Sequence, residues 1–302
     1  MIAERLTKKS DVVNWLGRQA GFRSYLEIST AFSGFQFGKI DRNQFVVAER
    51  VVYCATADFD DGLPVTGVSF SDDSGPGLAA LSINLRRFDV VFVDSWHSYE
   101  SSYRDIEYAL QLLSMGGVIV VHDCLPLSRE IADPKFHPGS WSGQTYLAFL
   151  DFVRKHVETA FVTIDMDFGC GVIQTRNEHG EFRFGQVPRH DALSLDHSNW
   201  EAFSNFGADA LCLLSPKQFV RIFRLKEPSV TSWLCDRLER PIAALRIFQL
   251  ARLVRRAAWG THRRVSRRSG EHAVRERLAI ERRNQFLEEF LGLDPDNLPS
   301  AF

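Results

Sequence analysis

The sequence predicts an α/β protein built around a doubly wound, seven-stranded and mostly parallel sheet, followed by a helical C-terminal region. Three observations lead to this fold class: short apolar segments rich in valine, a helical pattern between two of them, and two last apolar segments joined by a tight turn. Continuous rather than alternating apolar residues are typical of parallel strands that helices cover on both faces. Sheets of this kind bind ligands at the carboxyl ends of their strands.

The expected elements alternate along the chain. A helix over residues 4–19 leads into the first strand, and a helix over 99–115 connects two strands and ends at Gly116–Gly117. A further helix is predicted over 142–156, and the turn at Asp167–Gly169 joins the last two strands into a hairpin. The expected strands lie at 24–29, 50–55, 66–70, 88–94, 116–123 and, as the two arms of the hairpin, within 158–175.

The chain divides into two parts by composition. Residues 1–225 carry the alternating pattern, with a polar surface loop at 176–200 and short helices over 200–224, whereas residues 226–302 are helical in pattern and basic. With 302 residues, 45% hydrophobic and 25% charged, the chain can form one large α/β domain with an appendage, and its composition is that of an ordinary soluble protein. The formal net charge of -2 gives no global signature of nucleic-acid binding.

The cysteine pattern and the lengths of the apolar segments indicate the cellular compartment. The five cysteines are odd in number and show no C-x-x-C spacing, so neither a zinc knuckle nor a full disulfide framework is expected. The N-terminus lacks the continuous apolar segment of a signal peptide, and no apolar segment approaches the roughly 20 residues that span a bilayer. We therefore expect reduced thiols and a cytoplasmic protein.

The C-terminal part contains a basic stretch, residues 245–268, in which arginines and bulky apolar residues alternate without one acidic residue. Such a stretch could lie on an anionic membrane surface, as a peripheral contact, or bind an acidic partner. The alternative is a helix that packs on the domain and turns a solvated basic face outward. We expect no nucleic-acid partner.

Titratable side chains end two neighbouring strands of the predicted sheet. Asp94 ends the fourth strand, with His97 three residues later, and His122 and Asp123 end the fifth. His97 is the candidate general base, because the ordinary histidine pKa of about 6.5 lies near working pH. Asp94 and Asp123 are candidate ligands of a divalent cation, with Mg²⁺ the natural choice for hard oxygen donors. Neighbours in a strand point to opposite faces, so at most one of His122 and Asp123 should face a given pocket. The alternative is a helix-terminal aspartate beside a surface histidine.

The turn after the first strand is a second candidate ligand site. Glu27 lies at the end of that strand and could orient a ligand or the backbone of the turn, whose small residues would let a cofactor approach the main chain. Neither a G-x-G-x-x-G fingerprint nor a P-loop is present, which argues against nucleotide phosphate binding. An ordinary strand-to-helix turn is the alternative. Trp141 lies in a long loop that could form a lid or substrate wall, or anchor the next helix.

Taken together, these segments resemble class I S-adenosylmethionine-dependent methyltransferases of the methyltransferase 24 type, which act on sugars and natural products. The resemblance covers about residues 5–225 and is most specific in an ordered block of strand, D-x-x-H-x-Y-E, helix, G-G and H-D. The segments that carry it are YLEIS at 25–29, SDD at 71–73, the block at 88–126, WSGQTY at 141–146 and DMDFGCGVI at 165–173.

The resemblance implies a Rossmann-like methyltransferase fold, S-adenosylmethionine as the cofactor, Mg²⁺ as a candidate further cofactor, and O-methylation of a sugar or natural-product hydroxyl. The catalytic group would be His97, Asp94 and Asp123, with the proton removed by His97 or through a metal on the two aspartates. Asp94, Trp96 and His97 would form the pocket wall. The cofactor would contact residues after the first, third and fourth strands, namely Glu27, Ser29, Ser33, Gly34, Ser71, Asp72 and Asp94.

Two other functions stay open. Ser29 stands where the family has a glycine, and Cys54 stands where it has the carboxylate that holds the ribose, with Asp58 the nearest substitute downstream. The alternative is therefore a catalytically degenerate methyltransferase-like scaffold in a glycan or natural-product biosynthetic assembly, docked through its basic C-terminal region. A nicotinamide-dependent oxidoreductase would use the same kind of sheet, but the missing glycine fingerprint argues against it.

Overall fold

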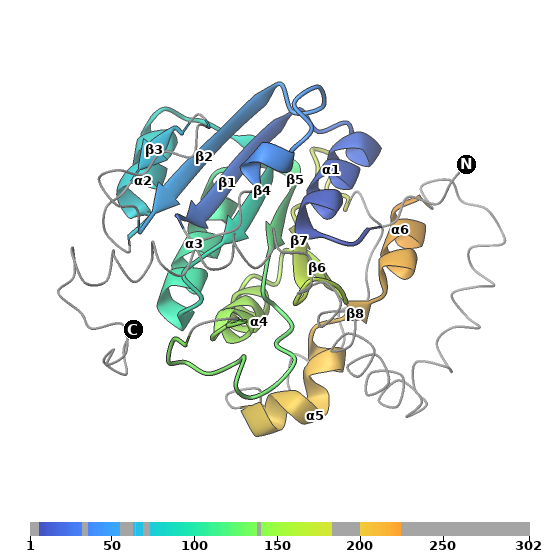
Figure 1. Cartoon of the computed structure of the whole chain (residues 1–302). Helices are drawn as coiled ribbons and strands as arrows, with labels where there is room; N and C mark the ends of the chain where they lie inside the picture. Colours follow the sequence, from blue (N-terminus) through green and yellow to red (C-terminus); the bar gives the residue numbers. More distant parts are fainter. Residues whose placement is uncertain are drawn as a thin grey trace, which may run out of the picture.

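The computed structural model has a central sheet with helices on both faces, as Figure 1 shows. The sheet order is β3-β2-β1-β4-β5-β7-β6-β8, and β7 runs antiparallel to both β5 and β6. The residues that the structure describes are 6–31, 36–54, 63, 65–68, 73–137, 140–182 and 200–224.

All seven predicted strands are present, and a short eighth strand, β8, pairs parallel with β6. The pairs from β3 to β5 are parallel, so their carboxyl ends meet at one edge of the sheet. The turn between β6 and β7 lies at the same edge, because Gly171 at the start of β7 pairs with Val121 at the end of β5. The strands are β1 (Ser24–Thr30), β2 (Val47–Tyr53), β3 (Gly67–Val68), β4 (Phe88–Asp94), β5 (Leu113–Val121), β6 (Ala160–Ile164), β7 (Cys170–Gln174) and β8 (Leu213–Leu214).

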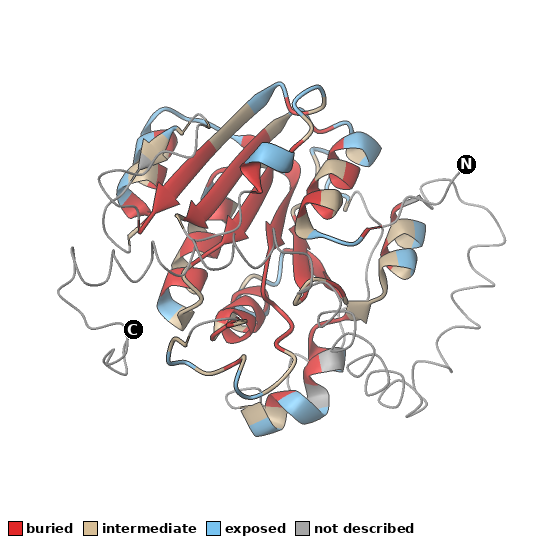
Figure 2. Cartoon of the chain, viewed as in Figure 1, coloured by how far each residue is buried: buried red, intermediate tan, exposed pale blue. Residues whose placement is uncertain are grey.

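The strands are buried on both faces, as their continuous apolar sequences predict, and Figure 2 shows the sheet as the most buried layer. One face of the sheet packs with the helices α2, α3, α4 and α5, and the other with α1, α6 and the short 3-10 helix η1. The helices are α1 (Lys9–Ala20), η1 (Phe37–Lys39), α2 (Gly75–Ile83), α3 (Tyr99–Gln111), α4 (Thr145–Lys155), α5 (Trp200–Ala210) and α6 (Pro216–Arg224).

The boundary between α3 and β5 differs from the prediction. The helix ends at Gln111 rather than at residue 115, and β5 already begins at Leu113, whose partner in β4 is Phe88. Gly116–Gly117 therefore does not stop a helix but lies inside the strand. A Cβ atom on Gly117 would come within 2.8 Å of the Asp89 carbonyl oxygen, so this close approach of two strands requires a glycine.

The two helices next to the expected ligand edge have clear sequence causes. The helix α3 begins after Ser98, whose hydroxyl accepts a hydrogen bond from the backbone N–H of Ser101 at 3.2 Å. The helix α1 ends at Gly21, which has the left-handed φ of 71° that favours glycine at this position. Both helices begin beside the carboxyl ends of strands and so bring their first residues to that edge.

The predicted short helices over 200–224 are confirmed as α5 and α6. The predicted surface loop at 176–200 lies mostly outside the described residues, and the basic region 226–302 lies wholly outside them. Among the helices that the structure describes, none has both the length and the apolar character needed to cross a membrane.

Candidate active site

Polar groups from five segments meet at the carboxyl edge of the sheet, all of them side chains except the backbone carbonyl of Trp141. Asp94 ends β4, His97 follows it ahead of α3, and His122 and Asp123 follow β5. The remaining members of the group come from the start of α1, from the loop before α4 and from the turn between β6 and β7: Lys9, Trp141, Ser142 and Asp167.

The structure brings together all three residues predicted to be catalytic. The His97 Nε2 atom lies 3.0 Å from Asp123 Oδ2 and 3.6 Å from Asp94 Oδ1. The two carboxylates are buried, whereas His97 keeps 20% of its side chain exposed. The group is therefore held inside the protein but can be reached from outside through the imidazole.

The expectation that His122 and Asp123 point apart is wrong. Their side chains converge, with His122 Nδ1 at 2.7 Å from Asp123 Oδ2. The physical reason is that β5 ends at Val121, and that Asp123 has a left-handed φ of 61°, so the alternation of a strand does not apply. His122 Nε2 is buried without a hydrogen-bond partner among the described residues and lies 3.7 Å from Asp167 Oδ2.

A second layer of contacts orients each of the three central side chains. The Lys9 ammonium donates to Asp94 Oδ2 at 2.7 Å, and the Ser142 hydroxyl donates to Asp123 Oδ1 at 2.9 Å. The His97 Nδ1–H donates to the Trp141 carbonyl oxygen at 2.7 Å, because a carbonyl oxygen can only accept. Each residue therefore has one polar atom tied to the protein and a second atom, Asp94 Oδ1, Asp123 Oδ2 or His97 Nε2, that faces the others.

The charges of the group perturb one another strongly. Burial alone would raise the pKa of Asp94, but the cations Lys9 and His122 beside it hold that pKa well below its ordinary value. Burial alone would lower the pKa of His97, whereas the Asp123 carboxylate raises it to about 9. Without a bound ligand, His97 is thus a proton donor to Asp123 at neutral pH.

The same geometry fits a divalent cation. One ligand atom each from Asp94, His97 and Asp123 lie within 4.8 Å of one another. Metal-bound histidines usually donate their second ring N–H to a carbonyl or carboxylate, as His97 does to Trp141. The prediction named the two aspartates as ligands but not His97 as a third, although the D-x-x-H spacing at the start of α3 could have indicated it.

The residues predicted to contact a cofactor are only partly described. Ser29, the last residue of β1 but one, lies beside Asp94, its register partner in β4. Glu27 is 2% exposed and lies beneath this edge, where it accepts hydrogen bonds from Tyr25 at 2.8 Å and Ser29 at 3.1 Å. The remaining predicted contacts fall outside the described residues, namely Ser33, Gly34, Ser71 and Asp72, as does the substitute carboxylate Asp58.

A buried network that the sequence did not predict supports the ends of β2 and β4. Asp105 of α3 is fully buried and accepts hydrogen bonds from Tyr53 and Ser95, each at 2.8 Å, and from Ser74. Tyr53 in turn accepts from the Trp96 backbone N–H at 2.7 Å. The network holds the backbone at Ser95 and Trp96, directly after Asp94, and so stabilises the position of Asp94 and His97.

Aromatic rings border the group on one side. The Trp96 ring is stacked with Phe136 at 5.8 Å, and Trp141 meets both of them edge to face, at 5.4 Å and 5.1 Å. The ring of His97 lies 5.4 Å from that of Trp141. Trp96 and Phe136 are partly exposed, so they present an aromatic wall next to the catalytic residues. Trp141 packs in this wall and its carbonyl oxygen binds His97, whereas the predicted roles of its loop, a lid or substrate wall or an anchor of the next helix, stay predictions.

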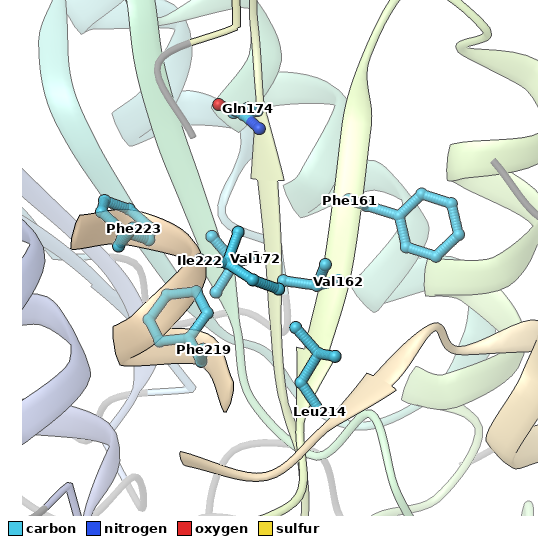
Figure 3. Close-up of a pocket in the computed structure, with 8 residues that line it drawn as sticks. All are labelled: Phe161, Val162, Val172, Gln174, Leu214, Phe219, Ile222 and Phe223. Carbon is cyan, nitrogen blue, oxygen red and sulfur yellow. The ribbon is translucent and has the colours of Figure 1, made fainter. Parts of the chain in front are cut away.

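A separate hollow lies between α6 and the strands β6, β7 and β8, as Figure 3 shows. It is lined by Phe161, Val162, Val172, Gln174, Leu214, Phe219, Ile222 and Phe223. Its lining has no titratable group, so it lacks the chemistry of a catalytic site.

Part of the sequence is similar to a known protein family. A family model described as a methyltransferase domain matches residues 30–124. This segment of the chain is therefore similar to methyltransferase domains. The match spans the block from the end of β1 to Cys124, which includes Asp94, His97 and Asp123, and it confirms the predicted resemblance to methyltransferases over this segment. No curated protein matches the chain in sequence.

Several solved structures are similar to the chain. The O-methyltransferase TomG from Streptomyces achromogenes, solved in complex with S-adenosylmethionine, is 17% identical, with 59% of this chain and 84% of that chain covered and a TM-score of 0.41. An O-methyltransferase from Bacillus cereus, solved with S-adenosylhomocysteine, is 16% identical, with 57% and 82% covered and a TM-score of 0.40. The predicted Rossmann-like methyltransferase fold is confirmed by the described sheet, which has the expected strands in a doubly wound order.

Proposed function

We propose that the protein is an S-adenosylmethionine-dependent O-methyltransferase whose acceptor is a hydroxyl of a sugar or sugar-containing natural product. The observation that carries the proposal is the convergence of Asp94, His97 and Asp123 at the ligand edge of a chain whose residues 30–124 match a methyltransferase domain. This edge is where a doubly wound sheet binds its ligands.

In the proposed reaction, the acceptor oxygen attacks the methyl carbon of the sulfonium, the carbon–sulfur bond breaks, S-adenosylhomocysteine leaves, and the hydroxyl proton passes to the protein. Positioning the oxygen in line with the methyl group supplies most of the acceleration. The proton acceptor is His97 or, through it, Asp123. For His97 to accept the proton, Nε2 must first give up the proton that it shares with Asp123, and the hydroxyl must then take the place of Asp123 at Nε2, since Nδ1–H is bound to Trp141.

Asp94, His97 and Asp123 would hold a divalent cation, Mg²⁺ as predicted or a cation that tolerates an imidazole ligand, such as Mn²⁺. A cation there would lower the pKa of a bound hydroxyl and so supply the chemistry that His97 would otherwise provide. In both cases the roles of Ser142 and Trp141 are the same, since they fix the atoms that face the acceptor.

The aromatic wall supports a sugar-containing acceptor. Trp96 and Phe136 are partly exposed beside His97, and aromatic rings pack against the apolar face of a sugar ring while carboxylates accept its hydroxyl protons. In this protein Trp141 connects the aromatic surface to the catalytic group, because its ring lies 5.4 Å from that of Trp96 and 5.4 Å from that of His97. The acceptor hydroxyl would then reach His97 from the wall.

The proposal is tested in two steps. Calorimetry with S-adenosylhomocysteine should show binding, and transfer of the labelled methyl group of S-adenosylmethionine should be measured on a panel of free and glycosidic sugars. Asp94→Ala and His97→Ala should each reduce the transfer by at least about 100-fold, since general acid–base groups contribute about that much. His179→Ala, at a side chain that is 72% exposed, is the matched control. Unchanged transfer by the Asp94 and His97 variants would refute the assignment.

A second function is favoured by the burial of Glu27 and by Cys54, which occupies the expected ribose-binding position with a left-handed φ of 54°. A protein that has lost the cofactor would be a scaffold in a biosynthetic assembly, with the basic region 226–302 contacting a membrane surface or an acidic partner. The calorimetric experiment separates the two functions. Absence of binding at millimolar S-adenosylhomocysteine would support the scaffold.

A further inference from the structure

Lys9, the first residue of α1, reaches the candidate active site although it lies well before the matched segment 30–124. Its side chain is 12% exposed, and its ammonium donates to Asp94 Oδ2 at 2.7 Å. Its backbone N–H donates to Asp167 Oδ2 at 3.1 Å. Lys9 therefore joins α1 both to the end of β4 and to the turn between β6 and β7.

The contact with Lys9 fixes the plane of the Asp94 carboxylate, with one oxygen on the ammonium and the other facing the site. With Oδ2 bound to the ammonium, Oδ1 lies 3.6 Å from His97 Nε2 and 3.5 Å from His122 Nδ1. A twist of the carboxylate plane about its Cβ–Cγ bond would move the bound oxygen away from the ammonium and break this charge-assisted hydrogen bond, which is stronger than a neutral one. Lys9 thus gives Asp94 a single orientation.

The burial of Lys9 distinguishes this contact from an ordinary surface ion pair. An ammonium is costly to remove from water, and a buried one persists where carboxylates surround it. Asp94, Asp123 and Asp167 all attract it, whereas the neighbouring Lys8 is exposed. The ammonium also lies 6.0 Å from the centre of the Phe92 ring of β4, at the distance of a cation–π contact.

We propose that Lys9 is a positioning residue of the active site, which holds the Asp94 carboxylate so that one oxygen faces His97 and Asp123. This inference rests on the proposed function for its meaning, because the oriented oxygen is the one that would face the acceptor or a cation. The helix α1 is then a part of the active-site wall and not only a cover of the sheet.

The test compares crystal structures of the wild type, Lys9→Met and Lys9→Arg, with Lys8→Met as the matched control. Lys9→Met keeps the length of the stem but removes the charge, so the Asp94 carboxylate should rotate and its Oδ1 should leave the 3.6 Å position beside His97. Lys9→Arg and Lys8→Met should both keep the wild-type orientation. Asp94 in its wild-type orientation in Lys9→Met would overturn the inference, as would a rotated carboxylate in Lys9→Arg.

A second measurement serves if Lys9→Met does not fold. Methyl transfer by Lys9→Arg and by Lys9→Gln, on an acceptor found with the wild type, should then be compared at saturating substrate. We expect kcat to fall about tenfold in Lys9→Gln and to be largely retained in Lys9→Arg, with KM for S-adenosylmethionine changed by less than about twofold. Equal kcat values would overturn the inference. Failure of the wild type to bind S-adenosylhomocysteine would instead refute the proposed function, and the crystallographic result would still decide the role of Lys9.

Discussion

Replacing Glu27 by Gln should change how the stability of the protein depends on pH. Glu27 is 2% exposed, and burial raises its pKa to about 7 even though Tyr25 and Ser29 donate hydrogen bonds to it. Its ordinary value is 4.5. A tenfold change in an acid constant corresponds to about 1.4 kcal/mol, so ionising Glu27 in the folded protein costs about 3 kcal/mol more than in the unfolded chain.

The sign follows from the raised pKa. Between about pH 4.5 and pH 7 the unfolded chain has lost the Glu27 proton while the folded protein still holds it, so the stability contributed by the protonated carboxyl is lost as the pH rises through this window. Glutamine cannot ionise. The free energy of unfolding of Glu27→Gln, relative to the wild type, should therefore rise by about 2 to 3 kcal/mol between pH 5 and pH 8.

Urea denaturation followed by circular dichroism at several pH values measures this difference. Glu178→Gln is the matched control, since that side chain is 80% exposed, and its curve should stay parallel to that of the wild type. Parallel curves for Glu27→Gln and the wild type would show that Glu27 is ionised in the folded protein across this range, and would refute the reasoning from burial.

Three further predictions concern the residues around the site. Gly143→Ala should lower the free energy of unfolding by at least about 2 kcal/mol, because Gly143 has a φ of 51° and an added Cβ would collide with the His97 carbonyl oxygen. Gly180→Ala is the control in thermal unfolding for the cost of the left-handed φ alone, since Gly180 has open space around it. Ser142→Ala should cost about 1 to 3 kcal/mol and reduce methyl transfer, because a buried Asp123 oxygen loses its donor, and unchanged stability and transfer would contradict the role given to Ser142. If Asp94, His97 and Asp123 hold a cation, treatment with a chelator should abolish the transfer and added Mg²⁺ or Mn²⁺ should restore it, whereas full activity in chelator would assign proton removal to His97 alone.

The fold could be predicted from the sequence because the patterns that determine its strands and helices are local. Valine-rich strands such as Phe88–Asp94 show their burial in composition, and the pattern of α3 shows which helix face covers them. The presence of Asp94, His97 and Asp123 at one edge follows from the parallel order of the strands. These statements require no knowledge of individual side-chain directions.

The parts of the site that sequence reasoning missed depend on backbone details and on distant contacts. The left-handed φ of Asp123 turned its side chain toward His122, which strand alternation does not anticipate. Lys9 reaches Asp94 across 85 residues of sequence, and no spacing rule connects the two. Glu27 was recognised by position, but its burial beneath the edge depends on the packing of Tyr25 and Ser29 around it.

The reversed direction of β7 has a practical consequence for anyone who wishes to trim this protein. The turn before β7 brings Asp167 to the edge that β5 reaches, and α1 adds Lys9 from the N-terminal side. The candidate active site is therefore assembled from residues on both sides of the matched segment 30–124. A fragment cut to residues 30–124 would even lack most of β1. Expression boundaries must therefore enclose at least Lys9 and Asp167.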